Sequence, residues 1–259
     1  MNKRKTFMNN KIITKAGAFY DNVAPFYEKM IDFEKNLKLR VEAYKKIFTE
    51  KGNAIDIGCG VGLDSIALAL NGHEVTSCDI SPNMIAEAKQ NAEKYNVNIA
   101  AEVNSFDTIG KENFGRFDYV ISVGNTVAHL KPKELEKAIG LVYKLLKPGG
   151  KLFLHILNYD LILKESKRVN NIANRDGEII IRFYDFRKKD IDFNILSFPI
   201  DKPKDFKIVS TKHYPHSAKQ IRSYLSKAGL TKIKLMKNFA GDKFSVRDSK
   251  DLFIEAIKD

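Results

Sequence analysis

Residues 54–62 constrain the fold more than any other segment, because they read AIDIGCGVG, an apolar strand followed by a glycine-rich turn. Ile55 and Ile57 flank Asp56, as expected of a buried parallel strand. Three glycines follow at alternate positions: Gly58, Gly60 and Gly62. They let the backbone turn tightly and come close to a ligand before a helix begins. The segment predicts a nucleotide-binding turn at the carboxyl end of a strand.

A second strand, EVTSCDIS, ends in Asp79, which lies 21 residues after Gly58. A carboxylate at that place accepts both hydroxyl hydrogens of a ribose in nucleoside-binding doubly wound folds. The alternative is a helix N-cap or turn residue, since Ser81-Pro82 reads as a helix start. The D-x-G-x-G-x-G spacing differs from the G-x-G-x-x-G of dinucleotide enzymes and argues against a nicotinamide dehydrogenase. We expect Asp79 to hold a ribose.

Short apolar runs alternate with amphipathic segments between residues 53 and 160, for example at 81–95 and 133–146. This alternation predicts an α/β fold with a mainly parallel, doubly wound sheet. Later segments rich in Ile, Phe, Tyr and Val are separated by polar turns and predict antiparallel strands. These segments are 178–187, 190–199 and 206–214. A helix over 217–228 and strands over 232–238 and 251–258 complete the prediction.

The chain divides into three predicted parts. Residues 1–50 form an N-terminal helical lid, in which 17–49 have helical spacing, Pro25 lies near a helix start and residues 1–15 are a frayed basic end. Residues 51–165 and 216–259 form the nucleotide-binding domain, and 166–215 form an inserted β cap over the substrate. The alternative for this insertion is a sheet extension that covers a core edge.

Composition limits the environment of the protein. Two cysteines in 259 residues, Cys59 and Cys78, suggest neither a disulfide framework nor a zinc cluster. No run approaches the roughly 20 apolar residues of a membrane span, and the basic N-terminus lacks the apolar core of a signal peptide. We therefore expect a cytoplasmic protein with no membrane partner and no bound metal.

Four further segments follow the glycine turn and Asp79 in a fixed order. They are Ser81-Pro82-Asn83-Met84, Asn104-Ser105-Phe106, residues 117–121 and residues 145–150. Together they resemble the Rossmann-like (class I) S-adenosylmethionine-dependent methyltransferases over roughly residues 40 to 160. The resemblance implies S-adenosylmethionine as the cofactor and a doubly wound, mainly parallel seven-stranded sheet. It also implies that the antiparallel β cap is inserted after the fifth strand.

The same resemblance implies a set of cofactor-binding residues. They are Arg40, Asp56, Gly58, Gly60, Gly62, Asp79, Ile80, Met84, Asn104, Ser105 and Val123. Arg40 matches the position that binds the methionine carboxylate, and Met84 the position that covers one adenine face. Ordinary alternatives remain for both, a solvated helix arginine and a helix packing residue.

A closer resemblance, to glycine and sarcosine N-methyltransferases, runs over nearly the whole chain. It rests on residues 62–66, 124–130, 158–160 and 213–216. It implies that Asn125 lies by the acceptor amine. These enzymes have an arginine that grips the substrate carboxylate just before Asn-Tyr-Asp, where this chain has Leu157. The missing guanidinium predicts poor turnover of glycine and an amine acceptor that lacks a carboxylate.

The acceptor site is expected to draw on side chains from all three parts. Asn125 and Tyr214 are the predicted catalytic residues. The predicted substrate-binding residues are Tyr27, Asn125, His129, Tyr159 and Tyr214. Tyr20, Tyr44 and His216 are further candidates, because tyrosines surround cationic centres and histidines handle protons. For each residue the alternative is packing, a turn or a structural hydrogen bond.

These observations predict an S-adenosylmethionine-dependent methyltransferase that acts on a nitrogen atom of a small molecule, with oxygen acceptors left open. A net charge of +12 favours an RNA methyltransferase instead. Against nucleic acid, the basic runs are short with acids close by, and Gly124-Asn125-Thr126-Val127 stands where base-modifying enzymes often carry Asn-Pro-Pro-Tyr. A third alternative is a protein that binds S-adenosylmethionine without transferring its methyl group. Nothing in the sequence indicates an oligomeric state.

Overall fold

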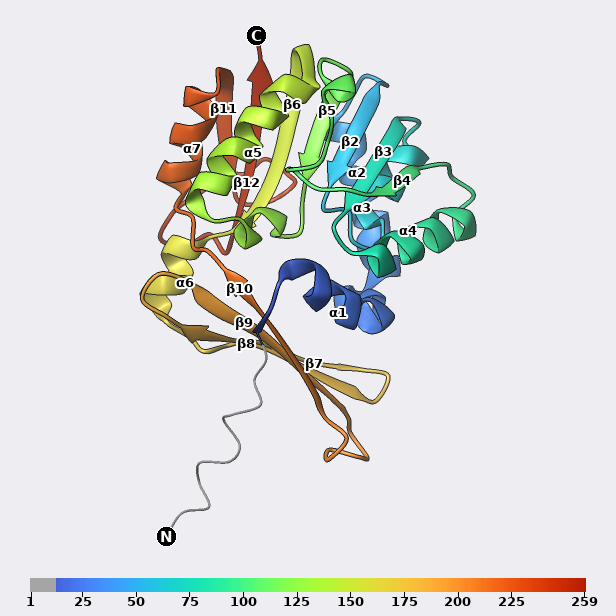
Figure 1. Cartoon of the computed structure of the whole chain (residues 1–259), viewed down its shortest axis with the longest axis vertical. Helices are drawn as coiled ribbons and strands as arrows, with labels where there is room; N and C mark the ends of the chain where they lie inside the picture. The colour runs from blue at the N-terminus through green and yellow to red at the C-terminus, as the bar shows by residue number, and fades with distance from the viewer. Residues whose placement is uncertain (1–12) are drawn as a thin grey trace.

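The computed structural model describes residues 13–259, so most of the frayed end expected for residues 1–15 lies outside the described residues, whereas Ile13 and Thr14 form a short strand. Two sheets lie one above the other (Figure 1). The larger, here the main sheet, has the strand order β11-β12-β6-β5-β2-β3-β4. Its strands are β2 (Asn53–Ile57), β3 (Glu74–Asp79), β4 (Ala100–Val103), β5 (Phe117–Ser122), β6 (Leu146–Leu157), β11 (Leu230–Met236) and β12 (Asp251–Lys258).

Strand direction in the main sheet follows the predicted fold class. β4, β3, β2, β5 and β6 pair in parallel, whereas β12, next to the other edge, is antiparallel to both of its neighbours, β6 and β11. β2 lies between β3 and β5, which both follow it in the chain, so the connections leave in opposite directions from this point. Ligands of open α/β sheets bind outside the carboxyl ends of the strands at such a point. The predicted doubly wound, mainly parallel seven-stranded sheet is confirmed.

Helices cover both faces of the main sheet. They are α2 (Phe33–Ile47), α3 (Leu63–Leu70), α4 (Pro82–Lys94), α5 (Pro132–Leu145), α6 (Tyr159–Glu165) and α7 (Ala218–Lys227), with short 3-10 turns η1 (Lys111–Asn113) and η2 (Thr126–His129). Side chains alternate between two cores, because successive strand residues point to opposite faces. Ile55 packs with Leu135 of α5 in one core, whereas Ala54 packs with Tyr44 of α2 in the other.

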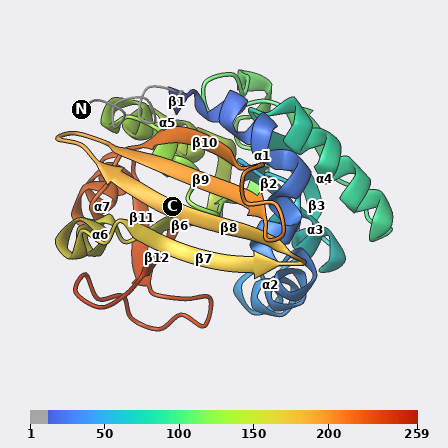
Figure 2. The same ribbon diagram turned by 90° about the horizontal axis from the view of Figure 1, so that it is seen from below.

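The smaller sheet, here the small sheet, lies across the carboxyl ends of the parallel strands (Figures 1 and 2). It contains β1 (Ile13–Thr14), β7 (Val169–Arg175), β8 (Glu178–Phe186), β9 (Ile191–Pro199) and β10 (Lys207–His213). β7 to β10 are antiparallel neighbours, and β1 pairs in parallel with β10. β8, β9 and β10 correspond to the three predicted strands, whereas β7 and β1 lack an apolar run that would predict them.

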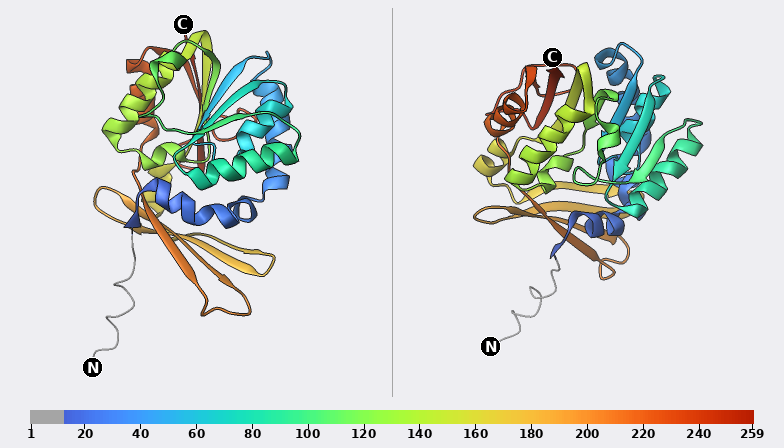
Figure 3. Two further views of the ribbon diagram at one scale, coloured as in Figure 1. Left: turned by 45° about the vertical axis from the view of Figure 1, so that its right-hand side comes forward. Right: turned by 45° about the horizontal axis from the view of Figure 1, so that its top comes forward.

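Helix α1 (Ala16–Ile31) lies between the two sheets (Figure 3). Its Phe19 and Val23 pack against Ile180 and Ile195 of the small sheet, and all four side chains are buried. On its other side the Ser81 hydroxyl donates a hydrogen bond of 2.6 Å to Asp21 Oδ1. The helix is therefore fastened to both sheets rather than standing free at the surface.

The expectation that Pro25 marks a helix start is wrong, since Pro25 lies inside α1. Proline has no N–H, so the carbonyl of Asp21, four residues earlier, has no helical donor. Asn83 Nδ2 donates to that carbonyl at 3.2 Å from the first turn of α4. The interior proline thus frees an acceptor that joins α1 to α4, a tertiary contact that the local sequence does not indicate.

Candidate functional site

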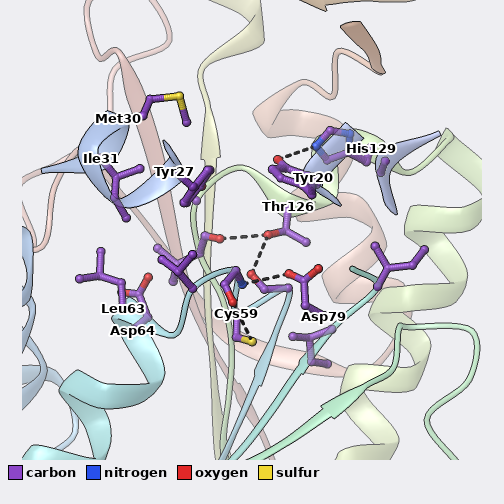
Figure 4. A pocket seen from close by; sticks show the side chains of 18 of the residues that line it. Tyr20, Tyr27, Met30, Ile31, Cys59, Leu63, Asp64, Asp79, Thr126 and His129 are labelled. Carbon is purple, nitrogen blue, oxygen red and sulfur yellow. Dashed lines mark hydrogen bonds between the residues drawn. The ribbon is translucent and has the colours of Figure 1, made fainter. Parts of the chain in front are cut away.

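A cavity of about 560 Å³ lies where the carboxyl ends of β2, β3 and β5 face α1 and the small sheet. Ligand sites in proteins commonly measure about 300–1,000 Å³. The turn after β2 forms one end of it, and Tyr20, Tyr27 and His129 lie across from that turn (Figure 4). Two arginines from the small sheet, Arg175 and Arg182, line it as well. The cavity therefore joins residues from Ala16 to Arg182.

The glycine turn brings its backbone to the cavity. The N–H groups of Gly58 and Cys59 both donate to the carbonyl of Cys78, at 2.7 and 3.0 Å, which fixes the turn against β3. Gly58 has φ +81°, and a Cβ there would lie 2.3 Å from Thr126 Cγ2. Only glycine fits such a position without displacing its neighbours. Gly62 lies outside the cavity lining, and its Cα instead faces Ala88 of α4.

Asp79 lies beside the turn at the end of β3. Its Oδ2 accepts the N–H of Gly60 and its Oδ1 accepts the N–H of Ser81, both at 2.9 Å. Burial raises the pKa of this carboxyl, while the backbone N–H groups oppose that shift. Each oxygen keeps a second lone pair, so the carboxylate still has capacity for two ribose hydroxyls. The N-cap of α4 is Ser81, whose Oγ accepts the N–H of Met84.

Two predicted cofactor residues lie beneath the cavity rather than in its lining. Asp56 is 1% exposed and accepts a 2.7 Å hydrogen bond from the Ser65 hydroxyl, which in turn accepts one from Ser77. Burial, followed by the nearby Asp64 carboxylate, raises the pKa of Asp56. Met84 is fully buried among core side chains. Asp56 therefore supports the turn from below, and Met84 is a packing residue of the core.

Arg40 lines the cavity from α2. Its Nε donates to Asp64 Oδ1 at 2.8 Å, and the Tyr44 hydroxyl donates to the same oxygen. The guanidinium carbon stands 4.0 Å from the ring centre of Phe239, within the range of a cation–π contact. Asp64, in the first turn of α3, was not predicted, and it holds the Arg40 fork at the cavity rim.

The remaining predicted cofactor residues come together along the sheet edge. Ile80, Asn104, Ser105 and Val123 all line the cavity. Asn104 follows β4, and its N–H donates to the Asp79 carbonyl at 3.0 Å, so the end of β4 is tied to the end of β3. Of the eleven predicted cofactor residues, Asp56, Gly62 and Met84 lie outside the lining, and the other eight face one space.

Neutral polar groups form the opposite wall. The Tyr20 hydroxyl lies 3.0 Å from His129 Nε2, and the Tyr20 and Tyr27 rings meet edge to face at 6.2 Å. Burial raises the pKa of Tyr27 to about 12 and lowers the pKa of His129 to about 4. Both side chains are therefore uncharged near neutral pH, and they offer hydrogen bonds without adding charge.

A second layer stands behind His129. Asn125 Nδ2 donates to the Tyr159 hydroxyl at 3.0 Å, and its Oδ1 accepts the N–H of Leu157 at 3.0 Å. The Tyr159 hydroxyl also lies 2.9 Å from His213 Nδ1, and the His213 ring stands edge to face with His129 at 4.7 Å. Asn125 and Tyr159 lie outside the cavity lining, so their contacts hold the wall rather than face a ligand.

We had selected Tyr214 from the segment His213-Tyr214-Pro215-His216, but His213 is the residue that points inward. Tyr214 lies outside the cavity lining, and its N–H donates to the Ala128 carbonyl at 2.7 Å. His216 Nε2 lies 2.8 Å from the Leu130 carbonyl. His213 is the residue that joins the buried layer, because it ends β10 on the face turned toward the main sheet. The alternation of side chains between the two faces of β10 could have indicated this orientation from the sequence.

Within residues 13–259 no helix is both long enough and apolar enough to cross a membrane. In the same part of the chain no cluster of three or more His, Cys, Asp or Glu side chains is arranged to hold a metal ion.

Comparison with known proteins gives matches to methyltransferases. Residues 54–150 match the family model described as a methyltransferase domain. A glycine/sarcosine N-methyltransferase of Parasynechococcus marenigrum is 31% identical over 161 residues, 59% of this chain and 57% of that protein. A ubiquinone biosynthesis O-methyltransferase of Xanthomonas oryzae is 35% identical over 104 residues, 40% of this chain and 42% of its own. The matched segments thus span about half the length of these relatives.

Among solved structures, an S-adenosylmethionine-dependent methyltransferase from Clostridium acetobutylicum superposes with a TM-score of 0.75 at 16% identity. The superposition covers 92% of this chain and 98% of the other. At that identity the likeness concerns the fold, and it extends over most of both chains. With the sequence matches, it confirms the predicted resemblance to class I methyltransferases.

Proposed function

Because the chain carries a class I methyltransferase domain, we propose that it transfers the methyl group of S-adenosylmethionine to a nitrogen atom of a small molecule. The observation that supports this most is the single cavity, which has the glycine turn and Asp79 on one side and Tyr20, Tyr27 and His129 on the other. A donor held at the turn and an acceptor held at the wall would share one space.

The residues of the sheet edge fit the cofactor. Asp79 keeps free lone pairs for the ribose hydroxyls, and Asn104 and Ser105 border the space beside it for the adenine. Arg40 presents its guanidinium at the rim for the methionine carboxylate. When bound, S-adenosylmethionine supplies a methyl group already activated by its sulfonium. Gly58 lets the turn lie directly against Thr126, because no Cβ occupies the space between them.

The wall residues orient the acceptor and exclude water. An amine must be neutral to attack, since an ammonium ion has no lone pair, and it must stand in line with the methyl at about 3 Å. Tyr27 and His129 are uncharged and offer hydrogen bonds to such an amine. With a pKa of about 4, His129 is a weak general base at neutral pH, so we assign it the role of orienting the acceptor. Helix α1 lines the space with Tyr20, Tyr27 and Met30.

An oxygen acceptor is the second candidate. The O-methyltransferase of Xanthomonas oryzae matches this chain at slightly higher identity than the N-methyltransferase, although over a shorter segment. An RNA acceptor has less support, because residues of α1 and of the small sheet line the cavity and restrict the access of a large molecule. The cytoplasmic location stays a prediction.

Transfer of labelled methyl from S-adenosylmethionine to a pool of small metabolites and total RNA tests the proposal. We expect acid-soluble label, attached to nitrogen when the product is fragmented in a mass spectrometer. Gly58→Ala serves as the cofactor-site control and should lose the signal. Acid-precipitable label that ribonuclease removes would contradict a small-molecule acceptor. Binding of S-adenosylhomocysteine without any transfer would point to a binding protein instead.

A further inference from the structure

Two arginines of the small sheet point into the cavity from neighbouring strands. Arg175 ends β7 and Arg182 lies in the middle of β8, and both line the cavity. In the register of this pair, Arg175 stands opposite Glu178, and Arg182 opposite Asn171. Because residues two apart share a face, both arginines lie on the face that carries Ile180 and Tyr184. That face is turned toward the main sheet.

Arg182 has no anionic partner among the described residues. Its Nε is buried and makes no hydrogen bond there. The groups that act on its charge are Tyr27, Tyr184 and Arg175, two neutral phenols and a second cation, while burial lowers its pKa. A guanidinium nevertheless stays protonated in proteins. A largely buried charge without a counterion carries a free-energy cost, and a binding site is one place where such a cost is retained.

Arg175 is only loosely engaged. Its Nε is likewise buried without a hydrogen bond to the described residues. The nearest carboxylate oxygen, Asp32 Oδ2, lies 3.9 Å from its Nη2, beyond hydrogen-bond range. Asp32 stands at the junction of α1 and α2 with φ +55°, at the rim of the cavity. Both arginines therefore keep donor groups free for a ligand.

Tyr27 separates these arginines from the cofactor turn. A Cβ placed on Gly60 would lie 3.8 Å from Tyr27 Cε1, so the phenol ring stands over the turn. Asp79 and Arg182 both act on the charge of that phenol, which places it between the sheet edge and the small sheet. Arg40 already lies at the rim by the turn for the methionine carboxylate. The Arg182 side thus belongs to the acceptor end.

We propose that Arg182, assisted by Arg175, forms an anion subsite for the methyl acceptor, which therefore carries a carboxylate or phosphate group. This inference rests on the proposed function and names its substrate class. It replaces the expectation, drawn from Leu157, of an amine without a carboxylate. Leu157 lies outside the cavity lining, and the guanidinium that grips the acceptor comes from β8 instead of the end of β6. Guanidinium forks bind either anion through two parallel hydrogen bonds.

The first test divides the acceptors by charge. A metabolite extract is passed over a strong anion exchanger at about pH 11, where ordinary amines are neutral and carboxylates and phosphates are retained. The retained and unretained fractions are then offered separately to the protein with labelled S-adenosylmethionine. We expect the label in products from the retained fraction, and phosphatase treatment of that fraction distinguishes a phosphate from a carboxylate.

The two ways of failing are distinct. Label from the unretained fraction alone would overturn the anion subsite and leave methyl transfer intact. Label from neither fraction would contradict the proposed function, and the subsite with it.

The second test uses Arg182→Met, with Arg222→Met on the exposed face of α7 as the matched control. We expect Arg182→Met to raise the KM for the retained acceptor about ten- to a hundredfold, as for loss of a hydrogen bond to a charged group. The KM of Arg182→Lys should lie between those of the wild type and Arg182→Met, and the KM of the control Arg222→Met should equal that of the wild type. Affinity for S-adenosylhomocysteine should be unchanged in all three variants.

Thermal unfolding separates binding from a structural role. Removing a buried charge that lacks a partner should keep or raise the Tm of Arg182→Met. A fall in Tm together with an unchanged KM would show that Arg182 serves the fold and would overturn the subsite. Loss of S-adenosylhomocysteine affinity with an unchanged acceptor KM would overturn it too, because the anion would then be the cofactor's own carboxylate.

Discussion

The two sides of the cavity are built in different ways. The cofactor side uses the ends of adjacent strands, and its groups are largely backbone N–H, glycine and one carboxylate, as at Gly58, Gly60 and Asp79. The acceptor side gathers side chains from α1, η2, β7 and β8, and it rests on a buried layer that includes Tyr159 and His213. The first is fixed by local chain geometry, and the second exists only when distant elements dock. We therefore expect changes on the cofactor side to abolish binding of any ligand, and changes on the acceptor side to alter selectivity and pH response.

The largest effect is expected from Gly58→Ala. The left-handed φ and the close approach to Thr126 together should cost roughly 2–5 kcal/mol. Affinity for S-adenosylhomocysteine, measured by calorimetry, should fall by at least about thirtyfold. Adding Thr126→Ala should recover only the contact part, because the unfavourable φ remains.

Gly140→Ala is the matched control, since Gly140 lies in α5 with open space around its Cα and no left-handed φ. It should gain about 0.5–1 kcal/mol of stability and leave affinity unchanged. Wild-type affinity in Gly58→Ala would break the distinction between the two sides, because the turn would then tolerate a side chain.

The next effect concerns pH and the acceptor side. The pKa of His129 is about 4 in the fold and about 6.5 when unfolded, so the unfolded chain binds more protons between these values. The stability that neutral His129 contributes is complete above about pH 6.5 and is lost as the pH falls toward 4. The loss should reach about 3 kcal/mol at most.

The measurement is the difference in unfolding free energy between the wild type and His129→Gln, whose amide can still reach Tyr20. This difference isolates His129, because the raised pKa values of Asp56 and Asp79 act in the opposite direction in both proteins. His213 also has a lowered pKa, and it contributes to the pH dependence of stability in both the wild type and His129→Gln. A difference that stays constant from pH 7 to pH 4 would show that His129 is not held neutral.

Asp79→Asn probes the cofactor side with a smaller change. The amide keeps the size of the side chain and loses the charge and one acceptor oxygen. We expect affinity for S-adenosylhomocysteine to fall by about 1.5–3 kcal/mol, the range for hydrogen bonds to a charged group. Asp118→Asn is the control, because Asp118 pairs with Lys147 away from the cavity and should affect stability alone. Equal affinity in the wild type and Asp79→Asn would remove the ribose role.

The smallest effect is expected at the hydrogen bond between Asp21 and Ser81, which joins the acceptor side to the cofactor side. Asp21→Ala removes the acceptor of the Ser81 hydroxyl, which joins α1 to α4. Loss of this hydrogen bond, about 1 kcal/mol, should speed dissociation of S-adenosylhomocysteine several-fold in stopped-flow measurements. Asn22→Ala is the control, because Asn22 bonds only within α1. An identical dissociation rate for both variants would mean that α1 does not hold the cofactor in place.

Sequence reasoning succeeded where function follows local geometry. Gly58, Gly60 and Asp79 could be predicted from spacing, because a turn after a parallel strand places them at one edge, and the family resemblance added Asn104. It was less informative at Met84 and Asp56, whose motif positions are equally suited to supporting the turn from below. The structure places them in the core and in a hydroxyl network.

On the acceptor side, the sequence supplied candidates but not their orientation. Tyr27 and His129 face the cavity as expected, whereas Asn125 and Tyr214 turn their hydrogen bonds to the backbone and to the buried layer. Arg175 and Arg182 were overlooked because an arginine in an antiparallel strand usually faces solvent. Which face of β8 is buried depends on where the small sheet docks, and strand periodicity alone does not settle that.

The sequence by itself determined the main sheet and its cofactor edge, because glycine conformations, strand periodicity and helix starts act over a few neighbouring residues. Tertiary structure alone decided the acceptor wall. It required α1 to be fastened to α4 through Asp21, the small sheet to lie across the strand ends, and β8 to turn Arg182 inward. These outcomes depend on packing between segments far apart in the chain, such as Asp21 and Ser81, which are 60 residues apart, and no local pattern encodes the energy of such contacts.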